Sequence, residues 1–163
     1  MPIPRTMLIV LPAAAALFVF ASGQSMPRIV ASHFAASGFA DGYSSRGAYL
    51  ALMIVAAAGL PAAVIGLQAV IGRKAPALGV PHGEYWLAPE RRDATLAFLD
   101  AQARRFAVLV AVFVSFVHWL VVKSNALQPP RMDAAWISSA LIVFLLATAA
   151  WLVAFYVRFR RRA

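Results

Sequence analysis

Residues 106–122 read FAVLVAVFVSFVHWLVV, an apolar run without Asp, Glu, Lys or Arg. A helix needs about 20 mainly apolar residues to span the hydrocarbon core of a bilayer, within a range of about 17–25. Three other uncharged apolar runs qualify, at residues 6–22, 48–72 and 134–157. The sequence therefore predicts an all-α integral membrane protein, a bundle of four transmembrane helices forming one membrane domain over residues 1–163.

The composition supports the same class of protein. Of the 163 residues, 63% are hydrophobic and 13% are charged, and the mean hydropathy is +0.77. A soluble domain is about half apolar and about a quarter charged, and disordered chains are poor in apolar residues, so both classes are excluded. Because the chain has no cysteine, disulfides, thiolate metal sites, c-type haem attachment and a cysteine nucleophile are excluded as well.

The first apolar run admits two interpretations. Arg5, the apolar residues 7–20 and the small residues 21–23 follow the order of a secretory signal peptide. We expect the segment to be retained as the first span instead. Pro12 and Pro61 lie inside the first and second spans, where each is expected to kink its helix.

Lysine and arginine are distributed unevenly between the segments that connect the spans. Eleven of the 15 fall at the two termini and in the loop 73–105, and four fall in the loops 23–47 and 123–133. Because positive residues concentrate on the cytoplasmic side, both termini and the loop 73–105 are expected in the cytoplasm. The net charge of +9 then reflects topology and contact with anionic lipids, and no nucleic-acid partner is expected.

Two spans carry rows of small residues on one helical face: Ala58, Ala62 and Gly66, and Ala147, Ala150 and Ala154. Within a membrane, small residues let two helices approach each other closely. We expect both rows to form contacts within the chain. A homodimer interface is the alternative use of the same residues.

The loop 23–47, predicted to lie on the extracytoplasmic side of the membrane, holds the candidate site. Residues 28–34 alternate as an extended segment would, with the odd-numbered residues on one side. Gly38 and the Asp41-Gly42 pair supply turn chemistry, because glycine permits positive φ and Asp-Gly favours a tight turn. We therefore expect a small folded cap at the mouth of the bundle.

His33 and Asp41 of this loop admit three roles. In the first, Asp41 orients His33 and both satisfy the local backbone. In the second, His33 and Asp41 join His118, the one titratable side chain within a span, to bind zinc or copper. The third role is a protein-contact surface with exposed aromatic anchors: Phe34, Phe39 and Tyr43.

Fixed positions follow the first span directly: Met26-Pro27-x5-His33-Phe34-x3-Gly38-x2-Asp41-Gly42-x3-Arg46. This pattern resembles the signature of the bacterial membrane domain of unknown function 1648, which is found in SdpI-like proteins. Residues 85–92, YWLAPERR, are also similar to a stretch that proteobacterial members carry between their second and third spans. The resemblance implies a bacterial inner-membrane protein with a role in toxin immunity or signalling. The candidate cap motif or partner-binding site comprises the matching residues and one aromatic neighbour: Pro27, His33, Phe34, Gly38, Asp41, Gly42, Tyr43 and Arg46.

The loop 73–105 contains a second amphipathic pattern. Pro89 suits the first turn of a helix, and Glu90 and Asp93 favour its positive end. Apolar residues toward one side and arginines toward the other predict a helix on the inner membrane surface that ends before the third span. Glu90, Asp93 and Asp100 lie at helical offsets from arginines and are expected to form ion pairs.

No nucleophile with a paired base is evident in the sequence. We therefore predict a non-enzymatic protein, without a cofactor, that binds a partner through its outer loop. The partner would be a toxin or peptide, a signalling protein, or a larger membrane complex with this chain as accessory subunit. The alternatives are a small transporter or channel component and a metal- or haem-associated redox subunit, for which one intramembrane histidine gives one axial ligand.

Overall fold

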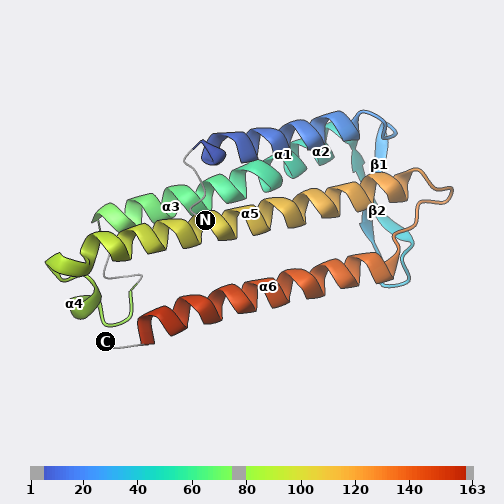
Figure 1. Ribbon diagram of the computed structural model, residues 1–163. Helices are drawn as coiled ribbons and strands as arrows, with labels where there is room; N and C mark the ends of the chain where they lie inside the picture. Colours follow the sequence, from blue (N-terminus) through green and yellow to red (C-terminus); the bar gives the residue numbers. More distant parts are fainter. Residues whose placement is uncertain (1–5, 75–79, 161–163) are drawn as a thin grey trace.

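The computed structural model describes residues 6–74 and 80–160, and most of them are helical (Figure 1). The helices are α1 (Met7–Gly23), α2 (Arg46–Ile54), the π-helix η1 (Val55–Gly59), α3 (Leu60–Lys74), α4 (Gly83–Trp86), α5 (Pro89–Asn125) and α6 (Ala134–Arg160). The strands β1 (Ile29–Phe34) and β2 (Ala40–Ser45) form an antiparallel hairpin. Figure 1 shows this hairpin at one end of the long helices, the hairpin end, and α4 at the other, the α4 end.

Three helices are long and apolar enough to cross a membrane: Arg46–Gly72, Pro89–Asn125 and Ala134–Arg160. Ile9–Gly23 is a shorter apolar helix. Large apolar side chains point outward from these helices, with Leu52 66% exposed and Val143 65% exposed. A continuous surface of this kind is foreign to a soluble monomer and suits contact with lipid.

Helix α5 is longer than the sequence predicted. The expected interfacial helix of the loop 73–105 and the expected third span at 106–122 are one uninterrupted helix of 37 residues. The arginines at 104 and 105 suggested a boundary, but both have high helix propensity and nothing between Pro89 and Asn125 interrupts the backbone ladder. Of the predicted ion pairs, Asp100–Arg104 is present; within the described residues, Glu90 and Asp93 form none.

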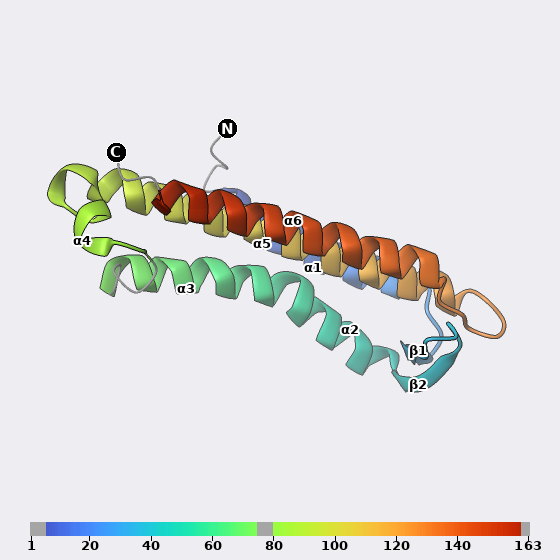
Figure 2. The same ribbon diagram turned by 90° about the horizontal axis from the view of Figure 1, so that it is seen from below.

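The second long segment bends where the sequence predicted a kink. Pro61 cannot donate a backbone hydrogen bond, and the turn before it, η1, widens so that the Leu60 amide donates to the Val55 carbonyl. Figure 2 shows the change of direction between α2 and α3. Pro61 itself is fully buried, so the bend is part of the packed structure.

Small residues do pack between the helices, but they are not the predicted ones. The alanines that are buried between the helices belong to α1, η1 and α5: Ala15, Ala57, Ala103, Ala107 and Ala111. In the predicted row, Ala62 and Gly66 are exposed and Ala58 is half-buried. The prediction was wrong by one residue, because four-residue spacing defines a row but not which of several rows faces a neighbour.

Helix α6 attaches to the rest through aromatic rings instead of small residues. Successive pairs of ring centroids from one end to the other are Phe116–Trp136 at 6.5 Å, Phe113–Phe144 at 4.3 Å, Phe106–Trp151 at 4.9 Å, Phe98–Phe155 at 6.3 Å and Trp86–Phe159 at 5.6 Å. We call this series the aromatic ladder. Ala150 and Ala154, predicted to face a neighbouring helix, are instead exposed.

Candidate functional site

The hairpin positions the predicted site residues. Its turn runs through residues 35–39 and closes with a hydrogen bond from the Gly38 amide to the Ala35 carbonyl, 2.8 Å long. Gly38 has φ +85°, and a Cβ on it would lie 2.5 Å from the Met132 carbonyl oxygen, so glycine is required there. The predicted turn at Asp41-Gly42 is wrong, because both residues belong to β2.

His33 and Asp41 contact each other across the hairpin. The Nδ1 of His33 lies 2.5 Å from the Oδ1 of Asp41, and both side chains are exposed, 75% and 48% respectively. Gly42 pairs with His33 in the register, and a Cβ on Gly42 would lie 2.8 Å from the Cβ of His33. The glycine therefore leaves the imidazole room to reach Asp41, as expected of a carboxylate that orients a histidine.

The irregular register divides the hairpin into a buried and an exposed side. Val30 is fully buried and Ala31 is 1% exposed, whereas Ile29 is 61% exposed. The expected alternation of odd and even residues is therefore wrong, because a shift in pairing beside Ser32 interrupts the period of two.

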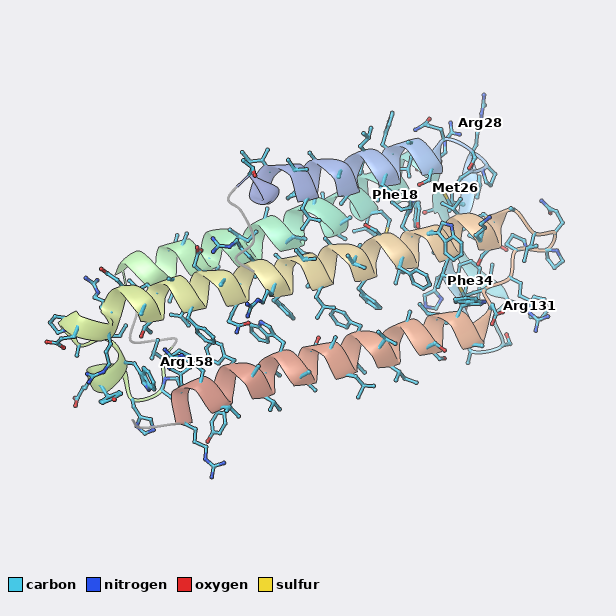
Figure 3. The ribbon with its side chains drawn as sticks, in the orientation of Figure 1. Phe18, Met26, Arg28, Phe34, Arg131 and Arg158 are labelled. Atoms are coloured by element: carbon cyan, nitrogen blue, oxygen red, sulfur yellow. The ribbon has the colours of Figure 1, made fainter. Side chains whose placement is uncertain are left out.

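The aromatic residues of the loop fall on both sides. Tyr43 is 59% exposed and Phe39 is 46% exposed, as the protein-contact interpretation expected. Phe34, predicted as a third exposed anchor, packs against the apolar core near the hairpin end (Figure 3). The exposed hairpin surface thus consists of Ile29, His33, Phe39, Asp41 and Tyr43.

Helix α5 holds the hairpin through the side chain of its last residue. Asn125 accepts a hydrogen bond from the Ala31 amide, 2.8 Å, and donates to the Ala31 carbonyl, 3.0 Å, and to the Val121 carbonyl, 2.9 Å. The side-chain amide thereby pairs with the edge of β1 as a neighbouring strand would. Sequence reasoning did not single out Asn125; the available signal was a lone asparagine at the end of an apolar helix.

Two further contacts fix the ends of the hairpin. Arg46 donates from Nη1 to the Gln24 and Met26 carbonyls, 3.1 and 3.0 Å away. At the turn, the Met132 amide donates to the Gly38 carbonyl over 2.8 Å. Arg46 and Gly38 of the predicted motif therefore serve the local structure, whereas Pro27 is exposed next to Met26, which is buried.

His118 lies apart from the hairpin residues, in a buried cluster between α1, α2 and α5. Its Nε2 is 3.0 Å from the Ser22 hydroxyl, and its Nδ1 is 3.0 Å from the Tyr49 hydroxyl. Ser22 donates its own proton to the Phe18 carbonyl over 2.6 Å. Nε2 must then donate to Ser22, and Tyr49 must donate to Nδ1, so a neutral imidazole has both ring nitrogens satisfied.

This arrangement does not bring together His33, Asp41 and His118, the three residues of the alternative metal-binding role. His118 has Ser22 and Tyr49 as partners, His33 has Asp41, and the described residues contain no group of three or more His, Cys, Asp or Glu that could hold a metal ion. Ser22 and His118 have the spacing of a nucleophile and its base. However, His118 is 0% exposed and the serine proton is already engaged, so the cluster joins three helices together.

The cluster predicts a coupled effect on stability. In His118→Leu the hydroxyl of Tyr49, a buried residue, loses its hydrogen-bond acceptor. The substitution should lower the free energy of unfolding by about 1–3 kcal/mol. Adding Tyr49→Phe removes the stranded hydroxyl, so the double variant should lose less than the sum of the two single losses. Reversible unfolding in mixed detergent micelles measures the cycle. Additive losses would show that the two side chains do not interact.

The Asn125 contact predicts a local effect at the hairpin. Asn125→Leu leaves the Ala31 amide and carbonyl without side-chain partners. Each buried group left in this way lowers the free energy of unfolding by about 1–3 kcal/mol. Hydrogen exchange at the Ala31 amide should therefore accelerate at least about 10-fold, since 1.4 kcal/mol is one factor of ten. Gln128→Leu, an exposed substitution in the following loop, is the matched control. Unchanged protection of residues 29–34 in Asn125→Leu would contradict the role of this side chain.

Comparison of the chain with protein-family models, with curated proteins and with solved structures found no match in any of the three.

Proposed function

We propose that this chain is a non-enzymatic membrane protein that binds a protein partner through its exposed hairpin surface. The observation that carries the proposal is the combination of exposed apolar side chains, Ile29, Phe39 and Tyr43, with the His33–Asp41 pair on one short hairpin. Aromatic residues beside a few oriented polar groups are the composition that protein interfaces favour.

The backbone beneath this surface is fixed before any partner arrives. Asn125 holds β1, Arg46 holds the segment before it, and Met132 holds the turn. A surface that is already ordered loses little conformational entropy on binding, which favours affinity. The hairpin therefore has the construction of a binding platform, and the partner would be a toxin or peptide, a signalling protein or a subunit of a larger complex.

We also propose four spans in an inner membrane, with both termini and α4 in the cytoplasm. Helix α1, at 17 residues, has a length of about 26 Å at 1.5 Å per residue, slightly less than the hydrocarbon core of about 30 Å. Its outward side chains are apolar, with Ile9 78% and Leu17 67% exposed, as expected of a short span that faces lipid.

The distribution of charge supports this orientation. In the half of the molecule nearer α4 the described basic side chains are Arg91, Arg92, Arg104, Arg105, Arg158 and Arg160, against Arg28, Arg46, Lys123 and Arg131 near the hairpin. Five other basic residues contributed to the predicted orientation, and their side chains lie outside the described part of the structure: Arg5, Arg73, Lys74, Arg161 and Arg162. Positive residues near span ends favour the cytoplasmic side, so the hairpin would face outward.

The resemblance of the hairpin motif to SdpI-like membrane proteins supports the same proposal. Its glycine and arginine positions, Gly38, Gly42 and Arg46, have roles in forming the hairpin. His33 and Asp41 need no partner for their mutual contact, yet both remain exposed. The motif would then comprise residues that form the hairpin and an exposed polar pair that contacts the partner. The chain would be a bacterial protein of the immunity or signalling type.

Substitution of the aromatic residues tests the binding surface. A photo-crosslinking amino acid at Tyr43 should trap the partner in native membranes, and Phe39→Ala with Tyr43→Ala should weaken its retention about 10-fold or more, since interface anchors contribute about 2 kcal/mol or more. Ser37→Ala, in the exposed turn, is the control. If the double variant retains the trapped partner as well as the unsubstituted protein does, this surface is not the contact.

The natural absence of cysteine makes the topology directly testable. Single cysteines at Ser37 and Gln128, both exposed near the hairpin end, should react with a membrane-impermeant maleimide on intact cells with the outer membrane removed. A cysteine at Glu84 of α4, also exposed, should react only after the membrane is permeabilised. Labelling of Ser37 and Glu84 from the same side would contradict the proposed orientation.

A further inference from the structure

The aromatic ladder leaves a groove between α5 and α6. The groove has a volume of about 320 Å³ and lies in the half of the two helices that is nearer the hairpin end. Its wall includes Val112, Phe113 and Phe116 of α5 and Trp136, Ala140 and Val143 of α6. Phe113 and Phe144 stack at 4.3 Å, so these rings keep the two helices apart at that level.

The groove is open to the surroundings of the helices. Val112 is 59% exposed and Val143 is 65% exposed, and both line the groove. Because α5 and α6 are long and apolar enough to cross a membrane, these side chains would face hydrocarbon. The groove could therefore take a flexible apolar chain along the helix axes.

A positive charge stands at one end of this apolar surface. Phe116, Trp119 and Lys123 are spaced by three and four residues along α5, so they lie on one helical face. The Lys123 Nζ is 5.7 Å from the centre of the Trp119 ring, which itself is 5.5 Å from the Phe116 ring. At 1.5 Å per residue, Lys123 lies about 10 Å beyond Phe116 toward the hairpin end.

Lys123 is exposed and forms no ion pair among residues 6–74 and 80–160. The order along the helix is therefore apolar groove, aromatic rings and then a cation. A glycerophospholipid has the same order of chemistry, from acyl chain through glycerol to phosphate. A hydrophobic helix of another protein would fill the groove but would bring no anion to Lys123.

We propose that the groove between α5 and α6 binds one acyl chain of a glycerophospholipid whose phosphate lies beside Lys123. The lipid bridges two helices that otherwise meet through spaced aromatic rings, and it covers apolar side chains that the chain leaves open. This inference requires α5 and α6 to lie in a bilayer, but it is independent of any protein partner at the hairpin.

Two substitutions test the two halves of the site. The detergent-purified protein is titrated with dioleoyl phosphatidylglycerol, and bound lipid is counted by native mass spectrometry. Lys123→Gln should weaken binding about fivefold, the factor that corresponds to about 1 kcal/mol for one cation at an anionic lipid. Ala140→Phe should abolish retention, because its ring occupies the groove. Dioleoylglycerol, which lacks the phosphate, should bind equally to Lys123→Gln and to the unsubstituted protein.

Matched controls separate this site from general contact with lipid. Arg28→Gln removes an exposed cation on the hairpin that points away from the helices (Figure 3). Ala150→Phe makes the same substitution as Ala140→Phe at an exposed residue of α6 that does not line the groove. Both controls should bind phosphatidylglycerol at the unsubstituted level. If Ala140→Phe fails to fold, the Lys123→Gln comparison still decides the phosphate contact.

A photoactivatable phosphatidylglycerol with a mid-chain diazirine locates the chain. It should label residues 109–116 and 139–144, and Ala140→Phe should remove that labelling. Equal affinities of Lys123→Gln and Arg28→Gln would overturn the proposed phosphate contact. Labelling spread evenly over all lipid-facing helices, or a mass showing a second copy or another protein in place of lipid, would overturn the proposed occupant.

Discussion

Buried polar groups in an apolar helix bundle must bond to one another, and at the hairpin end two side chains of α5 meet this constraint. His118 joins the hydroxyls of α1 and α2, and Asn125 joins the backbone of β1. Lipid offers no competing partners for such groups, so each contact holds its neighbour in one orientation. The position of the hairpin relative to the helices therefore depends on side chains seven residues apart on one helical face.

The remaining faces of α5 use different chemistry for different neighbours. Buried alanines such as Ala107 and Ala111 lie on α5, which packs against α1, η1 and α3, and aromatic rings such as Phe106 and Phe113 meet α6 at a distance. In a membrane the hydrophobic effect does not drive helices together, so the van der Waals contacts of closely packed small residues stabilise the association instead. Ring pairs give fewer contacts per turn, which explains why α6 retains so much open apolar surface.

The sequence predicted the apolar segments well, because length and the absence of charge are local properties. It also predicted an extended segment at residues 28–34 and, as one of three roles, a contact between His33 and Asp41. It did not predict that α5 continues through Arg104 and Arg105, since a charge pair marks a change of surroundings without interrupting a helix. Nor did it identify which alanine row faces inward, because that depends on how α1 and α5 meet the bend at Pro61. The role of Asn125 was missed for a similar reason, since its partner Ala31 is 94 residues away.

Some residues of the hairpin motif hold the structure of the hairpin, and others lie exposed on its surface. A Cβ on Gly38 would meet Met132, and a Cβ on Gly42 would meet His33. Arg46 donates hydrogen bonds from Nη1 to two backbone carbonyls. None of these three contacts reaches beyond the hairpin end, so their presence follows from folding alone. His33, Asp41 and Tyr43 are different, because folding buries none of them. An asparagine, an arginine and two glycines thus hold a surface that the fold leaves exposed, and this is the surface through which we propose that the protein binds its partner.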